Sequence, residues 1–250
     1  MNSKFPPLIS IIVAVFNGEK TIQQCIDSVA QQSYPYKELI IIDGGSTDRT
    51  VELIKANQDK VKYWISEPDG GIYHAWNKGL AQVSGEWVAF LGVDDIYLPT
   101  ALQDYVDYLL EHQSIQLDYI SSKVNLVNDN KLIRTIGKPW SWNAFRRYMN
   151  VAHVGSLHHK SLFIKYGLYD TTYKICADYE LLLRARGNLR AGFLNKTTVN
   201  MSVGGASDNH KALYETKQAK MKSGGRNSII CSIENIFGLF KFRLRKRFWY

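Results

Sequence analysis

The stretch KELIIIDGGSTDRTVELIK, residues 37–55, decides the fold of this chain. It opens with an apolar run, passes through Asp43 and two glycines, and continues in a pattern typical of a helix that begins at Ser46 or Thr47. A strand that is apolar on both faces is typical of a sheet that is covered on both faces. A strand, a glycine-rich turn and a helix in this order therefore predict a parallel sheet flanked by helices.

The same unit recurs through the first hundred residues. Further strands are expected over residues 8–16, 61–66 and 86–91. Helices are expected after a capping Thr21, over 71–83 and over 100–112. Because strands and helices alternate, we predict an α/β fold with a mainly parallel, Rossmann-like sheet.

The second half of the chain is less regular. Two alternating segments flank an Asn-Asp-Asn turn between residues 117 and 137, which predicts a hairpin. A helix is expected over 177–186, and an amphipathic, strongly basic helix over 226–250. We expect one main domain with an appended C-terminal element.

Composition excludes several classes of protein. With 250 residues, of which 45% are hydrophobic, the chain is long enough to bury a substantial core. The three cysteines contain no C-x-x-C pair, so neither a disulfide framework nor a zinc site is expected, and a reducing cytoplasm fits. No segment has the uninterrupted apolar length that would predict a membrane-spanning helix.

Carboxylates follow the predicted strands. Asp94 and Asp95 lie in FLGVDDIYLP, residues 90–99, directly after a strand, where ligands of parallel sheets bind. Two such carboxylates suit Mg²⁺ or Mn²⁺, with further coordination positions left for phosphate oxygens. The alternative is that the pair caps the helix that begins near Pro99.

Asp43 ends a different strand and has no metal-ligand neighbour. A carboxylate at that place can accept a hydrogen bond from a base N–H or a ribose hydroxyl. The adjoining GGSTDRT lacks both the G-x-G-x-x-G of a dinucleotide site and the lysine of a phosphate-binding loop. A nicotinamide enzyme and an ATPase are therefore disfavoured.

Five separated segments together resemble the family 2 glycosyltransferases with the GT-A fold, especially bacterial enzymes that build surface polysaccharides. The resemblance covers about residues 8–210 and implies inverting transfer of a sugar from a nucleoside diphosphate to a hydroxyl. It divides a catalytic domain, 1–210, into a nucleotide-sugar half of about 1–100 and an acceptor half of about 101–210, followed by a C-terminal element, 211–250. The segments are SIIVAVFNGEKTI, DGGSTDRT, SEPDGGIYHAWNKGL, GEWVAFLGVDD and ADYELLLR.

The resemblance also implies roles for individual residues. Asp95 is expected to bind the Mn²⁺ or Mg²⁺ ion, and Asp94 to lie nearer the ribose. A base contact at Asp43 favours a UDP- or dTDP-sugar. The residues expected around the nucleotide sugar are Ala14, Val15, Phe16, Asn17, Asp43, Asp69, Lys78 and Asp94.

Asp178 is the expected catalytic base, because an inverting displacement needs one carboxylate to take the proton of the acceptor hydroxyl. Glu180 lies about 200° further around a helix, so the two cannot face the same site. An N-cap is the alternative role for Asp178. His153 matches a histidine near the acceptor or diphosphate in the resembling enzymes, with a core position as the alternative.

Two departures from the family pattern keep a second function open. Gly92 occupies a position where many relatives carry a further aspartate, and Ala177 replaces a glutamate next to the base. A catalytically weak protein that binds sugar nucleotides, or a scaffold of a glycan assembly complex, is therefore the alternative to an active enzyme.

The C-terminal segment predicts membrane contact. Isoleucines and phenylalanines at helical spacing precede a basic cluster over Lys241–Arg247, a combination that suits an anionic membrane surface. Bulky apolar side chains suit lipid better than nucleic acid, and a helix packed on the core is the alternative. Because lipid-linked or oligosaccharide acceptors are typical of the resembling enzymes, we expect a cytoplasmic protein that is peripheral on the inner face of the cytoplasmic membrane.

Overall fold

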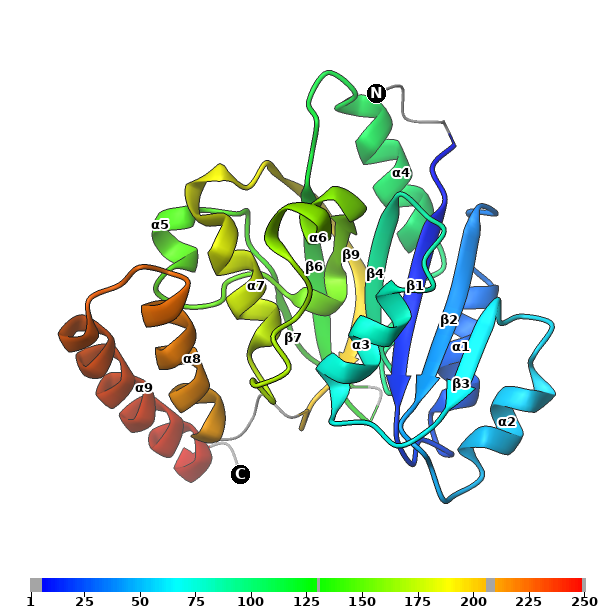
Figure 1. Cartoon of the computed structure of the whole chain (residues 1–250), viewed down its shortest axis with the longest axis horizontal. Coiled ribbons are helices and arrows are strands. Elements are labelled where there is room, and N and C mark those ends of the chain that lie inside the picture. The colour runs from blue at the N-terminus through cyan, green and yellow to red at the C-terminus, as the bar shows by residue number, and fades with distance from the viewer. Residues whose placement is uncertain (1–5, 130, 206–209, 249–250) are drawn as a thin grey trace.

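The structure is a computed structural model, in which residues 6–129, 131–205 and 210–248 are described, the side chains of 210 and 240–248 excepted (Figure 1). In this part of the chain, nine strands form one sheet in the order β3-β2-β1-β4-β8-β6-β9-β5, with β7 paired to β6. The first four strands are parallel, as predicted. They are β1 (Ile9–Val15), β2 (Lys37–Asp43), β3 (Tyr63–Ser66) and β4 (Trp87–Gly92).

Two apolar clusters lie on the two faces of this sheet. On one face, alternate residues of β1 such as Ile11 and Val13 pack with α1 (Ile22–Ala30), α2 (Thr50–Ala56) and α4 (Ala101–Glu111). On the other face, Ile12 and Ile42 pack with α3 (Ile72–Leu80) and α7 (Ala177–Ala185). Burial on both faces explains why the strands are continuous apolar runs.

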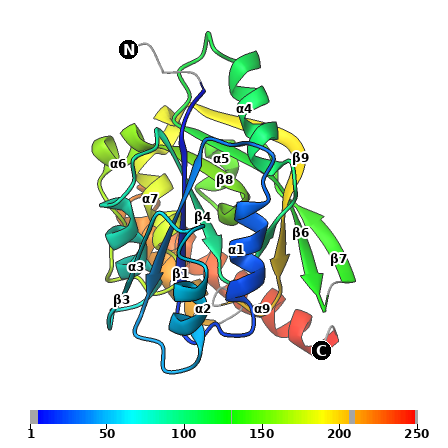
Figure 2. The same ribbon diagram turned by 90° about the vertical axis from the view of Figure 1, so that its right-hand side faces the viewer.

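The remaining strands complete a mixed sheet. β8 (Ser156–His159) is antiparallel to β4 and to β6 (Tyr119–Asn128), and β9 (Ala191–Ser202) is parallel to β6 and antiparallel to β5 (Ile96–Tyr97). The predicted hairpin is confirmed, because β7 (Lys131–Ile136) is antiparallel to β6, and Figure 2 shows the two strands side by side. The short helices between these strands are α5 (Trp142–Phe145), η1 (His153–Gly155), α6 (Lys160–Tyr166) and η2 (Arg186–Asn188).

The helix after β2 is where the sequence interpretation was wrong. It begins at Thr50, and not at Ser46 or Thr47, because the intervening polar groups bond to carboxylates of the turn. The backbone N–H groups of Gly45 and Ser46 donate to Asp43, and the Thr50 N–H donates to Asp48. The cap predicted at Thr21 also lacks a side-chain bond to the helix, since the Thr21 hydroxyl donates to the Gly18 carbonyl.

The last two helices of the chain lie on the side of α7. α8 (His210–Lys222) packs on α7, and α9 (Ser228–Phe248) packs on α8 (Figure 1). α9 runs toward the edge at which β1 and β2 end, so the end of this helix lies on that side of the molecule. Across the described residues, no helix combines the length and the apolarity that spanning a bilayer requires.

Candidate functional site

The carboxyl ends of the parallel strands gather the predicted site residues at one edge of the sheet. β1 lies between β2 and β4, with Val15 opposite Asp43 and Ala14 opposite Gly92. The chain segments that leave these three strands therefore emerge side by side, at the lower edge of the sheet in Figure 1. This register is why residues from three distant motifs share one site.

Asp43 organises the turn that follows β2. Its carboxylate is fully buried and accepts from the N–H groups of Gly45 (3.1 Å) and Ser46 (2.9 Å), from the Ser66 hydroxyl (2.6 Å), and from the Ser46 hydroxyl. Three of these donors bond Oδ2, and the Ser46 hydroxyl bonds Oδ1. An acceptor position therefore remains at Oδ1, and the base contact of Asp43 stays a prediction.

The end of β1 is tied to the same turn. Asn17 has a positive φ of 51°, and its amide oxygen accepts from the Thr47 N–H at 2.9 Å while its N–H donates to the Ser46 hydroxyl at 2.7 Å. Phe16 is 62% exposed and faces solvent at this edge. Val15 lies in the core and Ala14 is half-buried, so the exposed surface here comes from Phe16 and Asn17.

Asp69 lies above the glycine turn. A Cβ atom added at Gly44 would lie 3.2 Å from Asp69 Oδ2, so the absence of a side chain at Gly44 lets the carboxylate approach. The other oxygen of Asp69 accepts from the Gly71 N–H at 2.7 Å. Lys78 lies further along α3 and forms an ion pair with Glu67, with 2.7 Å between Nζ and Oε1.

Asp94 and Asp95 converge over Gly92. A Cβ atom at residue 92 would lie 2.5 Å from Asp95 Oδ2 and 3.0 Å from Asp94 Oδ1, so the two carboxylates fill the space that a side chain there needs. Asp94 is exposed, whereas Asp95 is 7% exposed and accepts from the Ser202 N–H at 3.0 Å. The Ser202 hydroxyl also donates to the Asp94 carbonyl, which fixes the end of β9 against the pair.

Burial, together with the charge of Asp94, raises the pKa of Asp95 to about 7. A cation between these carboxylates would relieve that repulsion. Within the described residues, no group of three or more His, Cys, Asp or Glu side chains could hold a metal ion. Two carboxylates still fit a hard cation that takes its other ligands from water and phosphate. The helix-cap alternative is wrong, because α4 begins at Ala101 with Thr100 at its cap position.

Asp178 is the second residue of α7, and Cys176 occupies the N-cap position instead. The Tyr73 hydroxyl lies 3.1 Å from Asp178 Oδ1 and 2.6 Å from the Ile175 carbonyl oxygen. Burial raises the pKa of Asp178 to about 6, although nearby backbone N–H groups and Tyr73 oppose the shift. A half-buried carboxylate with this pKa is suited to accept a proton near neutral pH.

Glu180 takes no part in this arrangement. It is buried on the opposite side of α7, where Arg184 Nε lies 3.0 Å from its carboxylate and the Ser223 hydroxyl donates to it. The two acids of α7 therefore face different surroundings, as the helical spacing predicted.

His153 belongs to an aromatic cluster beneath the site. Its ring stacks on Trp76 with 4.9 Å between centroids, and Nε2 lies 3.1 Å from the Tyr169 hydroxyl. Burial lowers the pKa of His153 to about 3, so the ring is neutral at physiological pH. This packing favours the alternative of a core position, and the contact with acceptor or diphosphate stays a prediction.

Sequence reasoning missed the residues that support these acids. Tyr73 lies within the segment SEPDGGIYHAWNKGL. Its place three residues after Gly70, where a helix begins, was the sequence feature that could have indicated it. No sequence pattern near Ser202 on β9 or Glu215 on α8 indicates their roles. Ser202 contacts Asp95, and Glu215 contacts Cys176, only because the fold brings these distant residues together.

Comparisons with known proteins agree with this geometry. The family model described as Glycosyl transferase family 2 matches residues 10–166. A PGL/p-HBAD biosynthesis glycosyltransferase of Mycobacterium bovis is 28% identical over 192 residues, which cover 73% of this chain and 71% of the relative. The structure of S. aureus TarS in complex with UDP-GlcNAc superposes with a TM-score of 0.70 at 18% identity, covering 91% of this chain and 70% of TarS.

A further solved structure contains a metal. The mannosyltransferase PcManGT from Pyrobaculum calidifontis, in complex with GDP-Man and Mn²⁺, superposes with a TM-score of 0.63 at 18% identity. The alignment covers 87% of this chain and 63% of that enzyme. Both structural likenesses concern the fold, and they agree with the mainly parallel sheet and flanking helices described above.

Proposed function

The chain belongs to glycosyl transferase family 2, and on this basis we propose that it is an inverting, divalent-cation-dependent enzyme of bacterial surface-polysaccharide synthesis. It moves a sugar from a UDP- or dTDP-sugar to a hydroxyl of a lipid-linked glycan. The observation that carries the proposal is the presence of two acidic sites with different surroundings. Asp94 and Asp95 converge over Gly92, and Asp178 is separate, half-buried and has a raised pKa.

The donor is assigned to the edge formed by Asn17, the turn after Asp43, and Asp69. This edge offers a buried carboxylate with one acceptor position, an exposed aromatic ring at Phe16, and two glycines that permit close approach. TarS forms a complex with UDP-GlcNAc and PcManGT forms one with GDP-Man, which supports a nucleotide sugar as donor. The free position at Asp43 Oδ1 suits the N3–H of uracil or thymine.

The divalent cation is assigned to Asp95 and Asp94, and the Mn²⁺ in the PcManGT complex supports this choice. A bound cation neutralises charge on the departing diphosphate. The two carboxylates supply a small ligand set, so cation and diphosphate are expected to bind together.

Asp178 is assigned as the base. One of its Oδ atoms accepts the proton of the acceptor hydroxyl. The hydroxyl oxygen forms the new bond to the anomeric carbon, and the diphosphate leaves with the electrons of the old bond. One carboxylate suffices for this displacement, which inverts the anomeric configuration. The aromatic cluster around His153 is uncharged at neutral pH and takes no proton in this step.

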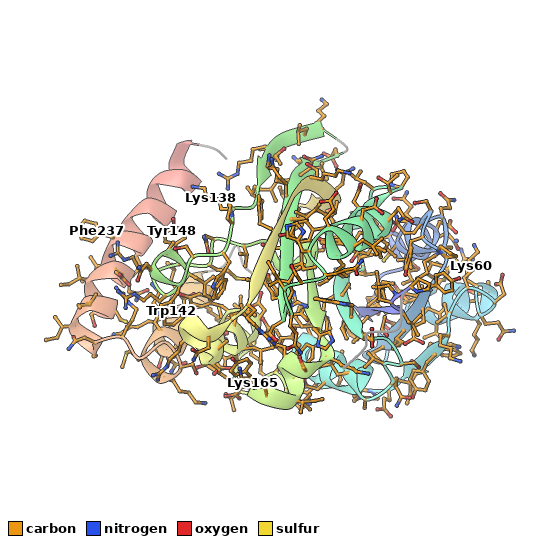
Figure 3. All side chains as sticks on the ribbon, turned by 90° about the horizontal axis from the view of Figure 1, so that it is seen from above. Lys60, Lys138, Trp142, Tyr148, Lys165 and Phe237 are labelled. Carbon is orange, nitrogen blue, oxygen red and sulfur yellow. The ribbon has the colours of Figure 1, made fainter. Side chains whose placement is uncertain are left out.

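The C-terminal helix is assigned to an anionic membrane on the cytoplasmic side. α9 turns Cys231 and Glu234 toward α8, and Glu234 pairs with Lys220 on α8 and with Arg226 in the segment between the two helices. Its outer side carries an apolar stripe, 48–70% exposed, with Phe237 pointing away from the molecule (Figure 3). The stripe comprises Ile229, Ile230, Ile233, Ile236 and Phe237. The side chains of Lys241–Arg247, on which the charge argument from sequence rests, lie outside the described residues.

A nucleotide-sugar screen tests the enzyme assignment. Melting temperature is measured with each donor, with and without Mn²⁺, because a ligand that binds the folded state raises stability in proportion to ln(1 + [L]/Kd). A donor that binds only with Mn²⁺ and is hydrolysed or transferred supports the proposal. Binding without hydrolysis or transfer to any acceptor favours the alternative, a sugar-nucleotide-binding or scaffold protein.

A vesicle assay tests the membrane assignment. The full chain should sediment with vesicles that contain phosphatidylglycerol, and Ile233→Ser with Phe237→Ser should lower that binding by at least ~10-fold, since each buried side chain contributes about 1.5–3 kcal/mol. Ile164→Ser is the matched control, because Ile164 is 83% exposed on α6 and outside the stripe. Equal binding of all three proteins would contradict the assignment.

A further inference from the structure

The segment that leads into the base, residues 169–178, is held from two sides. On one side, α3 contributes Asn77, whose amide donates to the Tyr169 carbonyl at 2.9 Å and accepts from the Tyr169 N–H at 3.1 Å. The Lys174 ammonium also donates to the Gly70 carbonyl at 2.9 Å, just before α3 begins. We call residues 169–178 the base segment.

On the other side, α8 contributes Glu215. This carboxylate accepts from three consecutive backbone N–H groups, those of Lys174 (2.9 Å), Ile175 (2.8 Å) and Cys176 (3.0 Å). These groups directly precede α7, which begins at Ala177, so the hydrogen bonds of the helix do not include them. Hydrogen bonds to an ionised acceptor are stronger than neutral ones, so Glu215 is the main anchor of this turn.

One peptide bond of the base segment lies between the two sides. The peptide that joins Ile175 to Cys176 donates its N–H to Glu215, and its carbonyl oxygen accepts from the Tyr73 hydroxyl at 2.6 Å. The same hydroxyl lies 3.1 Å from Asp178 Oδ1. A hydroxyl has one proton, so the orientation of this peptide decides how that proton is shared between Ile175 and Asp178.

We propose that Glu215 is a positioning residue for sugar transfer: by fixing the peptide between Ile175 and Cys176, it directs the Tyr73 proton to the Ile175 carbonyl and leaves Asp178 free to accept the proton of the acceptor. This inference rests on the proposed function, in which Asp178 is the base. It also extends the catalytic unit through α8, beyond the boundary expected at residue 210. The helix pair that carries the apolar stripe is thereby connected to the base.

Loss of Glu215 should lower the pKa of Asp178 in two ways. The charge of Glu215 raises the pKa of Asp178, and the hydrogen bond from Tyr73 lowers it. Without Glu215, the repulsion is lost and the Tyr73 proton is free to turn to Asp178, so both changes make Asp178 a weaker base. The other titratable groups that act on or are acted on by Asp178 are Tyr73, Tyr119, Tyr169 and Cys176.

Glu215→Gln in the full chain tests the proposal. A donor that raises the melting temperature is used with Mn²⁺, and kcat, the donor KM and the pH dependence of kcat are measured. We expect kcat to fall at least ~10-fold, because small displacements of a catalytic group cost up to about 100-fold. We expect the donor KM to change by less than about twofold and the acid limb of the pH profile to move to lower pH.

Glu234→Gln is the matched control. It removes the pair with Lys220 on α8 and the pair with Arg226 in the segment before α9, and it leaves the base segment untouched. It should lower the melting temperature without moving the pH profile. If Glu215→Gln behaves like Glu234→Gln, or keeps the kcat of the parent protein, the proposal is wrong.

Tyr73→Phe supplies an independent test, also for the case in which Glu215→Gln does not fold. Because Tyr73→Phe removes the proton that Glu215 directs away from Asp178, kcat should not fall, the donor KM should stay near normal, and the acid limb of the pH profile should stay in place or move to higher pH. A kcat that falls at least ~10-fold, or an acid limb that moves to lower pH, overturns the proposal. Failure of the proposed function is recognised separately. If Asp178→Asn transfers sugar normally, Asp178 is not the base and the proposed function fails. If Asp178→Asn is inactive and Glu215→Gln is fully active, only the present inference is refuted.

Discussion

Asp43 ends β2 and Asp178 lies at the start of α7, and the protein surrounds the two carboxylates in different ways. Asp43 is fully buried, and its two oxygens accept four hydrogen bonds from the turn after β2 and from β3. Asp178 is half-buried, and the side-chain donor that reaches it, Tyr73, lies closer to the Ile175 carbonyl than to the carboxylate. Asp43 is therefore held by side-chain and backbone donors of its own turn and of β3, whereas Asp178 shares its side-chain donor with a backbone carbonyl.

This difference distinguishes a carboxylate that stabilises the structure from one that can take a proton. A buried carboxylate that accepts several hydrogen bonds from one turn stabilises that turn, and it contributes to binding through the shape that it holds and through any acceptor position left free. A desolvated carboxylate with few donors keeps a raised pKa and binds a proton readily. Both aspartates follow recognisable motifs in the sequence, so the contrast becomes visible only from their surroundings.

The largest effect is expected at Asp178. Asn at this position keeps the shape of the side chain and removes the proton acceptor, so transfer should fall by ~10²–10⁴-fold while donor affinity stays near normal. Transfer rate and donor affinity are measured in parallel, with Asp104→Asn as the control, because Asp104 pairs with Lys196 on the surface. Near-normal transfer would show that Asp178 is not the base, and the contrast between a structural Asp43 and a reactive Asp178 would then be wrong.

A metal-site change should affect binding and rate together. Asp95→Asn removes one of two carboxylates over Gly92. Changes in groups that merely support a metal ligand already cost roughly 10–100-fold, so the Mn²⁺-dependent gain in diphosphate affinity should fall by at least that factor. Calorimetric titration of UDP in Mn²⁺ and in chelator measures the gain. Equal affinities in the two conditions for the parent protein would contradict a cation at this pair.

Asp43→Ala should destabilise the turn and weaken the donor site. The backbone N–H groups of Gly45 and Ser46 lose their acceptor, at a cost of about 1–3 kcal/mol in the free energy of unfolding. Donor affinity should fall by a similar amount, because the turn that lines the site is no longer held. Chemical denaturation and donor titration are compared with those of Asp178→Ala, which should keep donor affinity. If Asp43→Ala is as stable as the parent protein, the four hydrogen bonds contribute little to the free energy of unfolding.

The smallest effect is on stability as a function of pH. The pKa of Asp178 is about 6 in the folded protein and 3.8 in the reference state, so its stabilising contribution is fully present below pH 3.8 and is lost as pH rises through 6. Asp178→Asn removes the buried charge and should raise stability at pH 8 by roughly 1–3 kcal/mol. Melting temperatures at pH 4 and pH 8 provide the measurement. A variant that is less stable than the parent protein at pH 8 would contradict this sign.

Much of the fold follows from local patterns. Apolar runs, glycine-rich turns and helical spacing act over a few residues, and they predicted the parallel sheet, the hairpin and the helix over 177–186. The helix start at Thr50 was missed because Ser46 and Asp48 compete for the backbone of the turn, an outcome that depends on Asp43 and Asn17 being in place.

For the site, the sequence by itself determined which chemical groups are present: Asp43, Asp94, Asp95 and Asp178, each next to a strand or at a helix start. Tertiary structure decided their environments. Tyr73 and Asp178 are 105 positions apart, and Ser202 and Asp95 are 107 apart, so no local pattern announces either contact. The apolar stripe of α9 was equally undecided, because a helical period gives two faces and the packing of Glu234 on α8 selects which one faces outward. Burial and hydrogen bonding are set by groups that the chain brings from far away, and these set the pKa values on which the chemistry depends.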